Sequence, residues 1–346
     1  MDNVQTRPDR NLAMELVRVT EAAAIASARY LGRGDKNNGD KAAVDAMRAF
    51  LETVQMRGTV IIGEGEKDEA PMLYNGEIVG SGEGAEVDLA VDPVEGTRLL
   101  AEGRPNAISV IAAAEKGSMW NPGSSYYMDK IVVETLAREA IDINKSPSTN
   151  LVNIAEALGR PVEDLTVFVL DKPRHASLIE DIRQIGARIM LSTDGDVMGA
   201  LMAAIPGTGV DVLMGVGGTP EGVIAAAAVK ALGGGMQGKR TPQKLEEKRK
   251  LREQGVDLSQ VLGLDDLIRS NNTFFAATSI SASSFLEGVR FDQRGGVSTE
   301  SIVIRSLTGS IRYIKGIHQL NRKFEEGGSL GTTPAHVAMD IITTDE

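Results

Sequence analysis

EVDLAVDPVEGT, residues 86–97, begins as a buried strand with alternating apolar side chains and closes on two acids. Asp92 and Glu95 come where the strand stops. Pro93 fixes the turn, so the two carboxylates can point into one space, and Gly96 lets the backbone come close to a ligand. Polar residues at the end of a strand are typical of ligand sites in α/β proteins. This stretch therefore predicts an α/β fold with a site at the strand end.

The composition limits the classes of protein to consider. The chain has 346 residues, 42% of them apolar, which is enough for a large buried core. It has no cysteine, which excludes disulfides, thiolate nucleophiles and zinc–thiolate sites. The net charge of −11 argues against nucleic acid as a partner, because such binding needs a basic face. The start MDNVQTRPDR is polar, and no run approaches the roughly 18 apolar residues of a membrane span. We expect a cytoplasmic protein without a membrane partner.

The first part of the chain mixes helices and strands. An apolar stripe over residues 12–30 predicts a helix of about five turns. A second helix is marked by Ala43, Met47 and Phe50, and Asp40 stands just before it as the expected N-cap. Strands are predicted in GTVIIGEGE (58–66), DLAVDPVEGT (88–97), NAISVIAAA (106–114) and DKIVV (129–133).

From Thr166 onward, strands and helices alternate, which predicts a layered α/β half. We place a boundary in REAIDINKSPSTN, residues 138–150. It divides the chain into an N-terminal α+β half, residues 1–145, and a C-terminal α/β half, residues 146–346. The segment KLEEKRKLRE (244–253) predicts a solvated helix with ion pairs three and four residues apart.

Acids flanked by glycine recur along the chain. A single such acid can be a helix cap or a turn residue. That reading is weaker for GEGEKDEAP, because four acids within residues 64–69 repel one another unless a cation lies among them. With no cysteine and three histidines, carboxylate oxygens suit hard ions such as Mg²⁺ or Mn²⁺. The acids are Asp35, Asp40, Glu64, Glu66, Asp68, Glu69, Asp92, Glu95, Asp194, Asp196 and Glu221.

Basic residues that could bind an anion complement these acidic residues. In DKPRH (171–175), Lys172 and Arg174 follow a strand and open a helix, so they can hold an anion with the helix N-terminus; the alternative is a solvated surface turn. We interpret His175 as a structural hydrogen-bonding partner rather than a catalytic acid. GVGGTPEG (215–222) is a glycine-rich turn that fits neither nucleotide-binding fingerprint.

Together these features indicate a phosphoryl site bridged by metal ions. A pocket lined by carboxylates would repel an anionic substrate unless bound cations reversed the local charge. Thr97, beside the acids, could orient the attacking water.

Seven stretches in order resemble class II fructose-1,6-bisphosphatase, a family of the lithium-sensitive, metal-dependent phosphatase superfamily. The resemblance covers roughly residues 11–320 and implies a layered α/β/α/β/α sugar-phosphatase fold with two tightly packed halves. It also implies hydrolysis of fructose 1,6-bisphosphate, a gluconeogenic step, and a homo-oligomer, dimer or tetramer. The stretches are GRGDKNNGDKAAVDAM, GEGEKDEAPMLYNGE, DLAVDPVEGT, YYMDK, DKPRHASLI, TDGDV and GVGGTPEGVIAAA.

The resemblance assigns roles residue by residue. The implied catalytic residues are Asp40, Glu64 and Thr97, with Asp35 as the alternative first metal ligand to Asp40. The implied metal ligands are Asp40, Glu64, Asp92, Glu95 and Glu221. The implied sugar bisphosphate contacts are Glu95, Gly96, Thr97, Tyr127, Lys172, Arg174, Asp194, Asp196 and Gly218.

Other substrates and one other class of protein stay open. Sedoheptulose 1,7-bisphosphate is a second possible substrate. A related phosphatase acting on inositol monophosphate or a nucleotide phosphate is disfavoured, because both DKPRH and TDGD could hold a second phosphate and sugar hydroxyls. A sugar-phosphate-binding protein without turnover would be expected to lose part of the metal set, whereas every matching acid is present.

Overall fold

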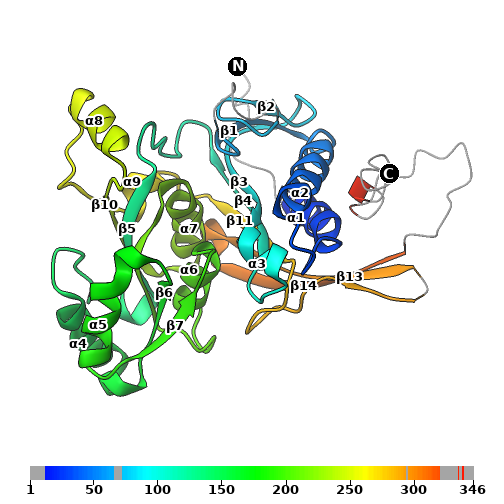
Figure 1. The fold of residues 1–346 in the computed structure, drawn as a ribbon. Coiled ribbons are helices and arrows are strands. Elements are labelled where there is room, and N and C mark those ends of the chain that lie inside the picture. Colours follow the sequence, from blue (N-terminus) through cyan, green and yellow to red (C-terminus); the bar gives the residue numbers. More distant parts are fainter. Residues whose placement is uncertain (1–11, 66–71, 294, 320–333, 335–336, 339–346) are drawn as a thin grey trace, which may run out of the picture. The chain divides into compact units, whose positions relative to one another are not determined.

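The computed structural model describes residues 12–65, 72–293, 295–319, 334 and 337–338 (Figure 1). The chain divides into two compact units. The first is built from the described parts of Met1–Lys116, Phe274–Arg305 and Ser310–Glu346, and the second from Gly117–Thr273 and Ser306–Gly309. Three of the predicted acids, Glu66, Asp68 and Glu69, lie outside the described residues.

The first unit contains a sheet whose strand order is β12-β13-β11-β4-β3-β1-β2, with β14 paired to the other side of β13. β1 and β3 run parallel, and the other pairs are antiparallel. The strands are β1 (Met56–Ile62), β2 (Ile78–Val79), β3 (Ala85–Glu95), β4 (Ile108–Glu115), β11 (Phe274–Ser279), β12 (Arg290–Phe291), β13 (Gly296–Arg305) and β14 (Ser310–Gln319).

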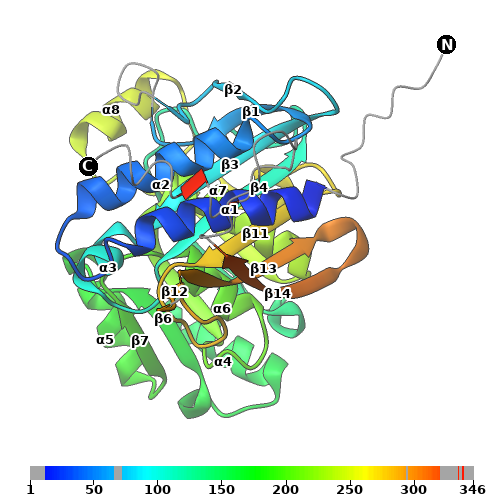
Figure 2. The ribbon, with the colours of Figure 1, turned by 90° about the vertical axis from the view of Figure 1, so that its right-hand side faces the viewer.

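Two long helices, α1 (Leu12–Ala28) and α2 (Lys36–Leu51), lie across one face of this sheet (Figure 2). The predicted stripe is the reason: Leu16, Val19 and Ala23 are completely buried against the strands. A short helix, α3 (Thr97–Glu102), follows β3 directly.

The second unit contains a six-stranded sheet in the order β10-β9-β5-β8-β6-β7. Its strands are β5 (Tyr127–Val133), β6 (Thr166–Leu170), β7 (Arg188–Ser192), β8 (Val212–Gly218), β9 (Gly235–Arg240) and β10 (Val261–Gly263). Its helices are η1 (Thr135–Ala137), α4 (Pro147–Leu158), η2 (Val162–Asp164), η3 (Pro173–His175), α5 (Ala176–Gln184), α6 (Val197–Ala204), α7 (Thr219–Leu232), α8 (Leu245–Glu253), α9 (Leu264–Leu267) and η4 (Ser306–Thr308).

Helices cover both faces of the second sheet. Alternate strand residues such as Ile131 and Val167 pack with α4 and α5. On the other face, Phe168 lies against Gly199 of α6, and Met128 lies against Gly222 of α7. The predicted layered α/β fold and the alternation from Thr166 are confirmed.

Two details of the structure differ from the sequence prediction. The boundary expected at residue 145 lies inside the second unit, because β5, which precedes it, pairs with β8 and β9, which follow it. The prediction of Asp40 as an N-cap is wrong. The helix begins at Lys36, four residues before Asp40, and Asp35 caps it by accepting a hydrogen bond from the Asn38 backbone N–H at 3.2 Å.

The charged segment forms α8, with the expected ion pairs Lys250–Glu246 and Arg249–Glu253. Among the described helices, none is both long enough and apolar enough to cross a membrane.

Candidate active site

Asp40 lies in the second turn of α2, on the same face as Lys36 one turn earlier. Burial raises the pKa of the Asp40 carboxyl, and the Lys36 charge partly opposes that shift. The neighbouring Gly39 lets α2 approach α3, because a Cβ at Gly39 would lie 2.8 Å from Leu100. The two helices that carry Asp40 and Thr97 therefore adjoin.

Glu64 and Asp92 lie at the carboxyl ends of two parallel neighbours, β1 and β3. Ile62 of β1 pairs with Ala90 of β3, and each acid lies two residues after one member of this pair. The Glu64 loop is fixed by its backbone N–H, which donates to the Leu73 carbonyl at 2.9 Å. The structure thus brings Glu64 and Asp92 to the same edge of the sheet.

The DPVEGT turn contains a β-bulge. The register between β3 and β4 shifts between Asp92 and Glu95, which face Val110 and Ile108 respectively. Asp92 Oδ1 accepts a hydrogen bond from the Val94 N–H at 3.1 Å. The bulge re-aims the side chains, so that Asp92 is partly exposed while Glu95 is buried.

Gly96 and Thr97 join the bulge to α3. Gly96 is the N-cap of the helix and has a left-handed backbone with φ of 87°, which favours glycine. Thr97 is the first helical residue and is partly exposed. The sequence motif therefore places a hydroxyl directly after the two acids, at the start of a helix.

Lys130 is the central cation of the second unit. Its Nζ lies 2.5 Å from Asp196 Oδ2 and donates to the Gly218 carbonyl at 2.9 Å, and its side chain is only 2% exposed. Asp196 stands at the N-terminus of α6. A Cβ at Gly217 would lie 1.8 Å from Asp196 Oδ2, so only glycine leaves room for this ion pair.

Glu221 folds back on the glycine-rich turn from the first turn of α7. A Cβ at Gly218 would lie 1.8 Å from Glu221 Oε2. This oxygen is buried and has no hydrogen-bond partner within the described part of the chain. Burial raises the pKa of Glu221, Asp196 raises it further, and Lys130 opposes them. A buried carboxylate oxygen without a donor suits a cation, so the residues fit the hard metal that the sequence indicates.

The DKPRH turn lies beside β5 and β8. Arg174 donates through Nε and Nη2 to the Val216 carbonyl at 3.0 and 2.7 Å. Its guanidinium lies over the Tyr127 ring, 5.5 Å from the ring centre. Lys172 is partly exposed at the start of the turn. The turn therefore presents two bases next to an aromatic ring.

His175 is structural, as predicted. The Val216 N–H donates to its Nε2 at 2.8 Å, so Nδ1 carries the proton and donates to the Leu170 carbonyl at 2.6 Å. Burial lowers the pKa of this imidazole, which stays neutral and holds the DKPRH turn to β8.

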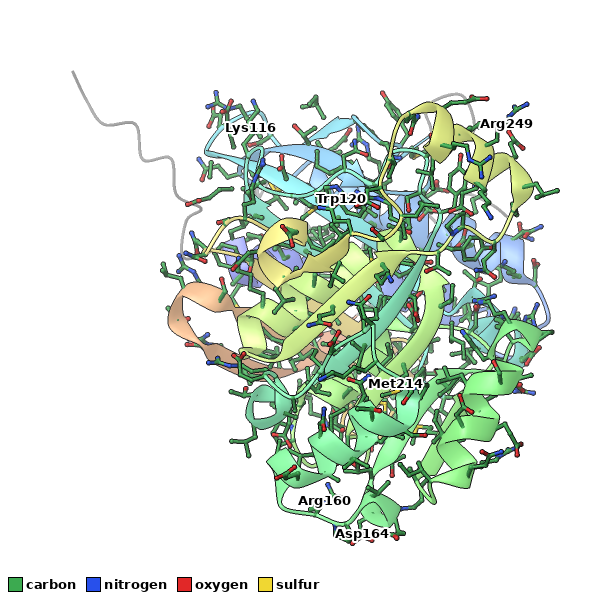
Figure 3. The ribbon with its side chains drawn as sticks, turned by 90° about the vertical axis from the view of Figure 1, so that its left-hand side faces the viewer. Lys116, Trp120, Arg160, Asp164, Met214 and Arg249 are labelled. Atoms are coloured by element: carbon green, nitrogen blue, oxygen red, sulfur yellow. The ribbon has the colours of Figure 1, made fainter. Side chains whose placement is uncertain are left out.

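A cavity of about 240 Å³ lies behind this turn, on the side of α4 and α5. Its lining includes Asp129, Ile131, Lys145, Arg174 and Met214, the last labelled in Figure 3. Burial raises the pKa of Asp129. Neither Asp196 nor Glu221 lines the cavity, whereas Lys130, the ion-pair partner of Asp196, does.

The site elements are therefore formed within each unit. Asp40, Glu64, Asp92, Glu95 and Thr97 belong to the first, and Tyr127, Lys172, Arg174, Asp194, Asp196, Gly218 and Glu221 to the second. Asp194 lies in the turn before α6, where its carbonyl accepts a hydrogen bond from Ser192 Oγ at 2.6 Å. In the ranges that the structure describes, no three acidic or histidine side chains come close enough to hold one ion.

Sequence reasoning did not single out Lys130. It lies in YYMDK, where the apolar residues after it predicted an ordinary strand. A lysine within a strand that is buried on both faces is a sign of a buried anion nearby, and this signal could have found it.

Comparisons with known proteins show which family the chain belongs to. A family model described as bacterial fructose-1,6-bisphosphatase, glpX-encoded, matches residues 10–318. The chain is 46% identical over 331 residues to fructose-1,6-bisphosphatase 1 class 2 of Escherichia coli strain K12, covering 92% of this chain and 98% of that protein. The same identity and coverage hold for the class 2 fructose-1,6-bisphosphatases of Escherichia coli O6:H1 strain CFT073 and of Shigella flexneri. The chain therefore belongs to the family of bacterial, glpX-encoded class 2 fructose-1,6-bisphosphatases.

Proposed function

We propose that this chain hydrolyses fructose 1,6-bisphosphate to fructose 6-phosphate and inorganic phosphate, a gluconeogenic step. The proposal rests on the family match together with one structural observation. Glu221 Oε2 is buried without a donor against Gly218, close to the Lys130–Asp196 pair. Such an arrangement suits a cation, and the family consists of metal-dependent phosphatases.

Mg²⁺ or Mn²⁺ is the proposed metal, because the candidate ligands are all carboxylates. When bound, such an ion supplies a water of lowered pKa and neutralises charge on the transferring phosphoryl group. The residues proposed to supply metal ligands, shared among more than one ion, are Asp40, Glu64, Asp92, Glu95 and Glu221.

The remaining residues have proposed roles in binding and orientation. Lys172 and Arg174 bind phosphate oxygens, and the Tyr127 ring supports the Arg174 guanidinium. Asp194 and Asp196 accept hydrogen bonds from sugar hydroxyls, while Glu95, Gly96 and Gly218 complete the contacts to the sugar bisphosphate.

In the reaction itself, the attacking water is oriented by the Thr97 hydroxyl and by the carboxylates of Asp40 and Glu64. The water oxygen bonds to phosphorus as the phosphorus–oxygen bond to the sugar breaks, and the proton that the water loses is balanced by the proton that the leaving sugar oxygen takes up.

The test is phosphate release by purified protein with Mg²⁺, with Mn²⁺ and with EDTA. Fructose 1,6-bisphosphate is compared with sedoheptulose 1,7-bisphosphate and inositol monophosphate. Metal-dependent release from the fructose bisphosphate is the expected result, and the sedoheptulose arm sets the substrate range. Faster release from inositol monophosphate would replace the proposed substrate. No release from folded protein with either metal would favour a binding protein without turnover.

A homo-oligomer, dimer or tetramer, is part of the proposal. It is supported by β14, which pairs with β13 alone among the described strands and exposes 55% of Tyr313 and 76% of Ile317. Light scattering coupled to gel filtration tests it, and a monomer would refute it. The cytoplasmic location stays a prediction.

A further inference from the structure

The helix α8 contains one acid that is not solvated. Its Arg249 faces outward (Figure 3), and the side chain of Lys250 is partly exposed to solvent. Glu247 is instead completely buried, although it lies in a run of charged residues. A buried carboxylate needs hydrogen-bond donors, and the donors to Glu247 show which part of the chain the helix contacts.

The donors are three backbone N–H groups. Glu247 Oε1 accepts from Tyr126 at 2.6 Å and from Tyr127 at 2.9 Å, and Oε2 accepts from Gln243 at 3.0 Å. Consecutive N–H groups of an extended strand point to opposite sides. Because two of them converge on one oxygen here, the backbone turns at Tyr126, and the carboxylate fixes where β5 begins.

Tyr127 is the first residue of β5 and is held on its other sides as well. It pairs with Gly218 of β8, and its carbonyl accepts from the Thr241 N–H at 2.9 Å. Its ring lies against the Arg174 guanidinium. A shift at the start of β5 would therefore move the aromatic ring, and with it the base proposed to bind phosphate.

We propose that Glu247 is a positioning residue of the sugar bisphosphate site, and that α8 serves to hold Tyr127 in place. The inference rests on the proposed function, since it takes Tyr127 and Arg174 as substrate contacts. A misplacement of about 1 Å in a substrate-orienting group can cost on the order of 100-fold in rate. Loss of the carboxylate should therefore show in substrate binding rather than only in stability.

The experiment compares Glu247→Ala with Glu246→Ala, measuring KM and kcat for fructose 1,6-bisphosphate at saturating metal. Glu246 is the matched control, because it is adjacent on the same helix and its side chain is 68% exposed. We expect KM to rise about 10-fold in Glu247→Ala and to stay within about twofold of wild type in Glu246→Ala. Glu247→Gln keeps one acceptor oxygen, so its KM should lie between those of wild type and Glu247→Ala, and it serves if the alanine variant does not fold.

A double-mutant cycle with Tyr127→Ala separates positioning from general destabilisation. If Glu247 acts through Tyr127, its removal should change KM much less in the Tyr127→Ala background. Full additivity of the two changes would overturn the inference. So would wild-type KM in both Glu247 variants while Tyr127→Ala raises KM, and that outcome would leave the proposed function intact. An unchanged KM in Tyr127→Ala would refute the substrate role of Tyr127 itself.

Discussion

Gly218→Ala tests whether the glycine-rich turn exists to seat a carboxylate. Gly218 has φ of −69° and ψ of 144°, an extended backbone that alanine adopts without strain. The added Cβ would lie 1.8 Å from Glu221 Oε2 and 2.4 Å from its Cδ. The carboxylate must therefore retreat by more than about 1 Å, whereas the backbone need not move.

The magnitude follows from what that carboxylate is proposed to do. Disturbing the groups that orient a metal ligand typically costs 10- to 100-fold in metal affinity or activity, which corresponds to about 1.4 to 2.7 kcal/mol. We expect Gly218→Ala to need 10- to 100-fold more Mg²⁺ or Mn²⁺ for half-maximal phosphate release. The assay is a metal titration of phosphate release, run beside thermal unfolding without metal to confirm the fold.

Gly263→Ala is the matched control. Gly263 also caps a helix with an extended backbone, and its Cβ would find Asp266 at 3.6 Å, an ordinary contact. This variant should have the metal requirement of the wild type. If Gly218→Ala has it as well, Glu221 is not a ligand and the reasoning fails.

Three further predictions use other residues. Asp92→Asn keeps an oxygen for the Val94 N–H, so its melting temperature should match wild type while turnover falls by orders of magnitude; wild-type turnover would remove Asp92 from the metal set. Lys130→Met strands the buried carboxylate of Asp196 and should cost about 3 to 5 kcal/mol of unfolding free energy in urea, and a loss below about 1 kcal/mol would contradict the buried pair. The pKa of His175 is lowered in the folded state, so the unfolded chain binds a proton first as the pH falls below about 6.5. Wild-type stability should then fall by up to about 1.4 kcal/mol per pH unit. His175→Gln should lack this part of the slope in urea unfolding at about pH 5 and about pH 8, and equal slopes would show that another group is responsible.

The second helix, α2, shows what local sequence can and cannot predict. Its apolar stripe located the helix, because burial of one face repeats with the helical period. The cap was misassigned, because Asp35 and Asp40 both precede apolar residues and polar residues continue through the first turn. Only the hydrogen bond from Asn38 distinguishes the two acids.

Glu247 shows a different limit. The charge pattern predicted a solvated helix, and Glu246 and Lys250 confirm it. Nothing in that pattern could show that the acid between them meets the N–H groups of Tyr126 and Tyr127, more than 100 residues earlier in the chain. The motifs predicted which polar residues follow strand ends, and their assignment to the site stays a prediction; the contacts that support them depend on long-range pairing.

The return of the chain to the first sheet has a consequence for synthesis on the ribosome. β4 pairs with β3 on one side and with β11 on the other, and β11 begins at Phe274, after almost the whole second unit. Until that residue has emerged, β4 presents an apolar strand with an open edge. A fragment ending near Lys116 should therefore aggregate, whereas the second unit, nearly continuous in the chain, can fold as soon as it has left the ribosome. In the order of synthesis, the unit that begins the chain is the last to be completed.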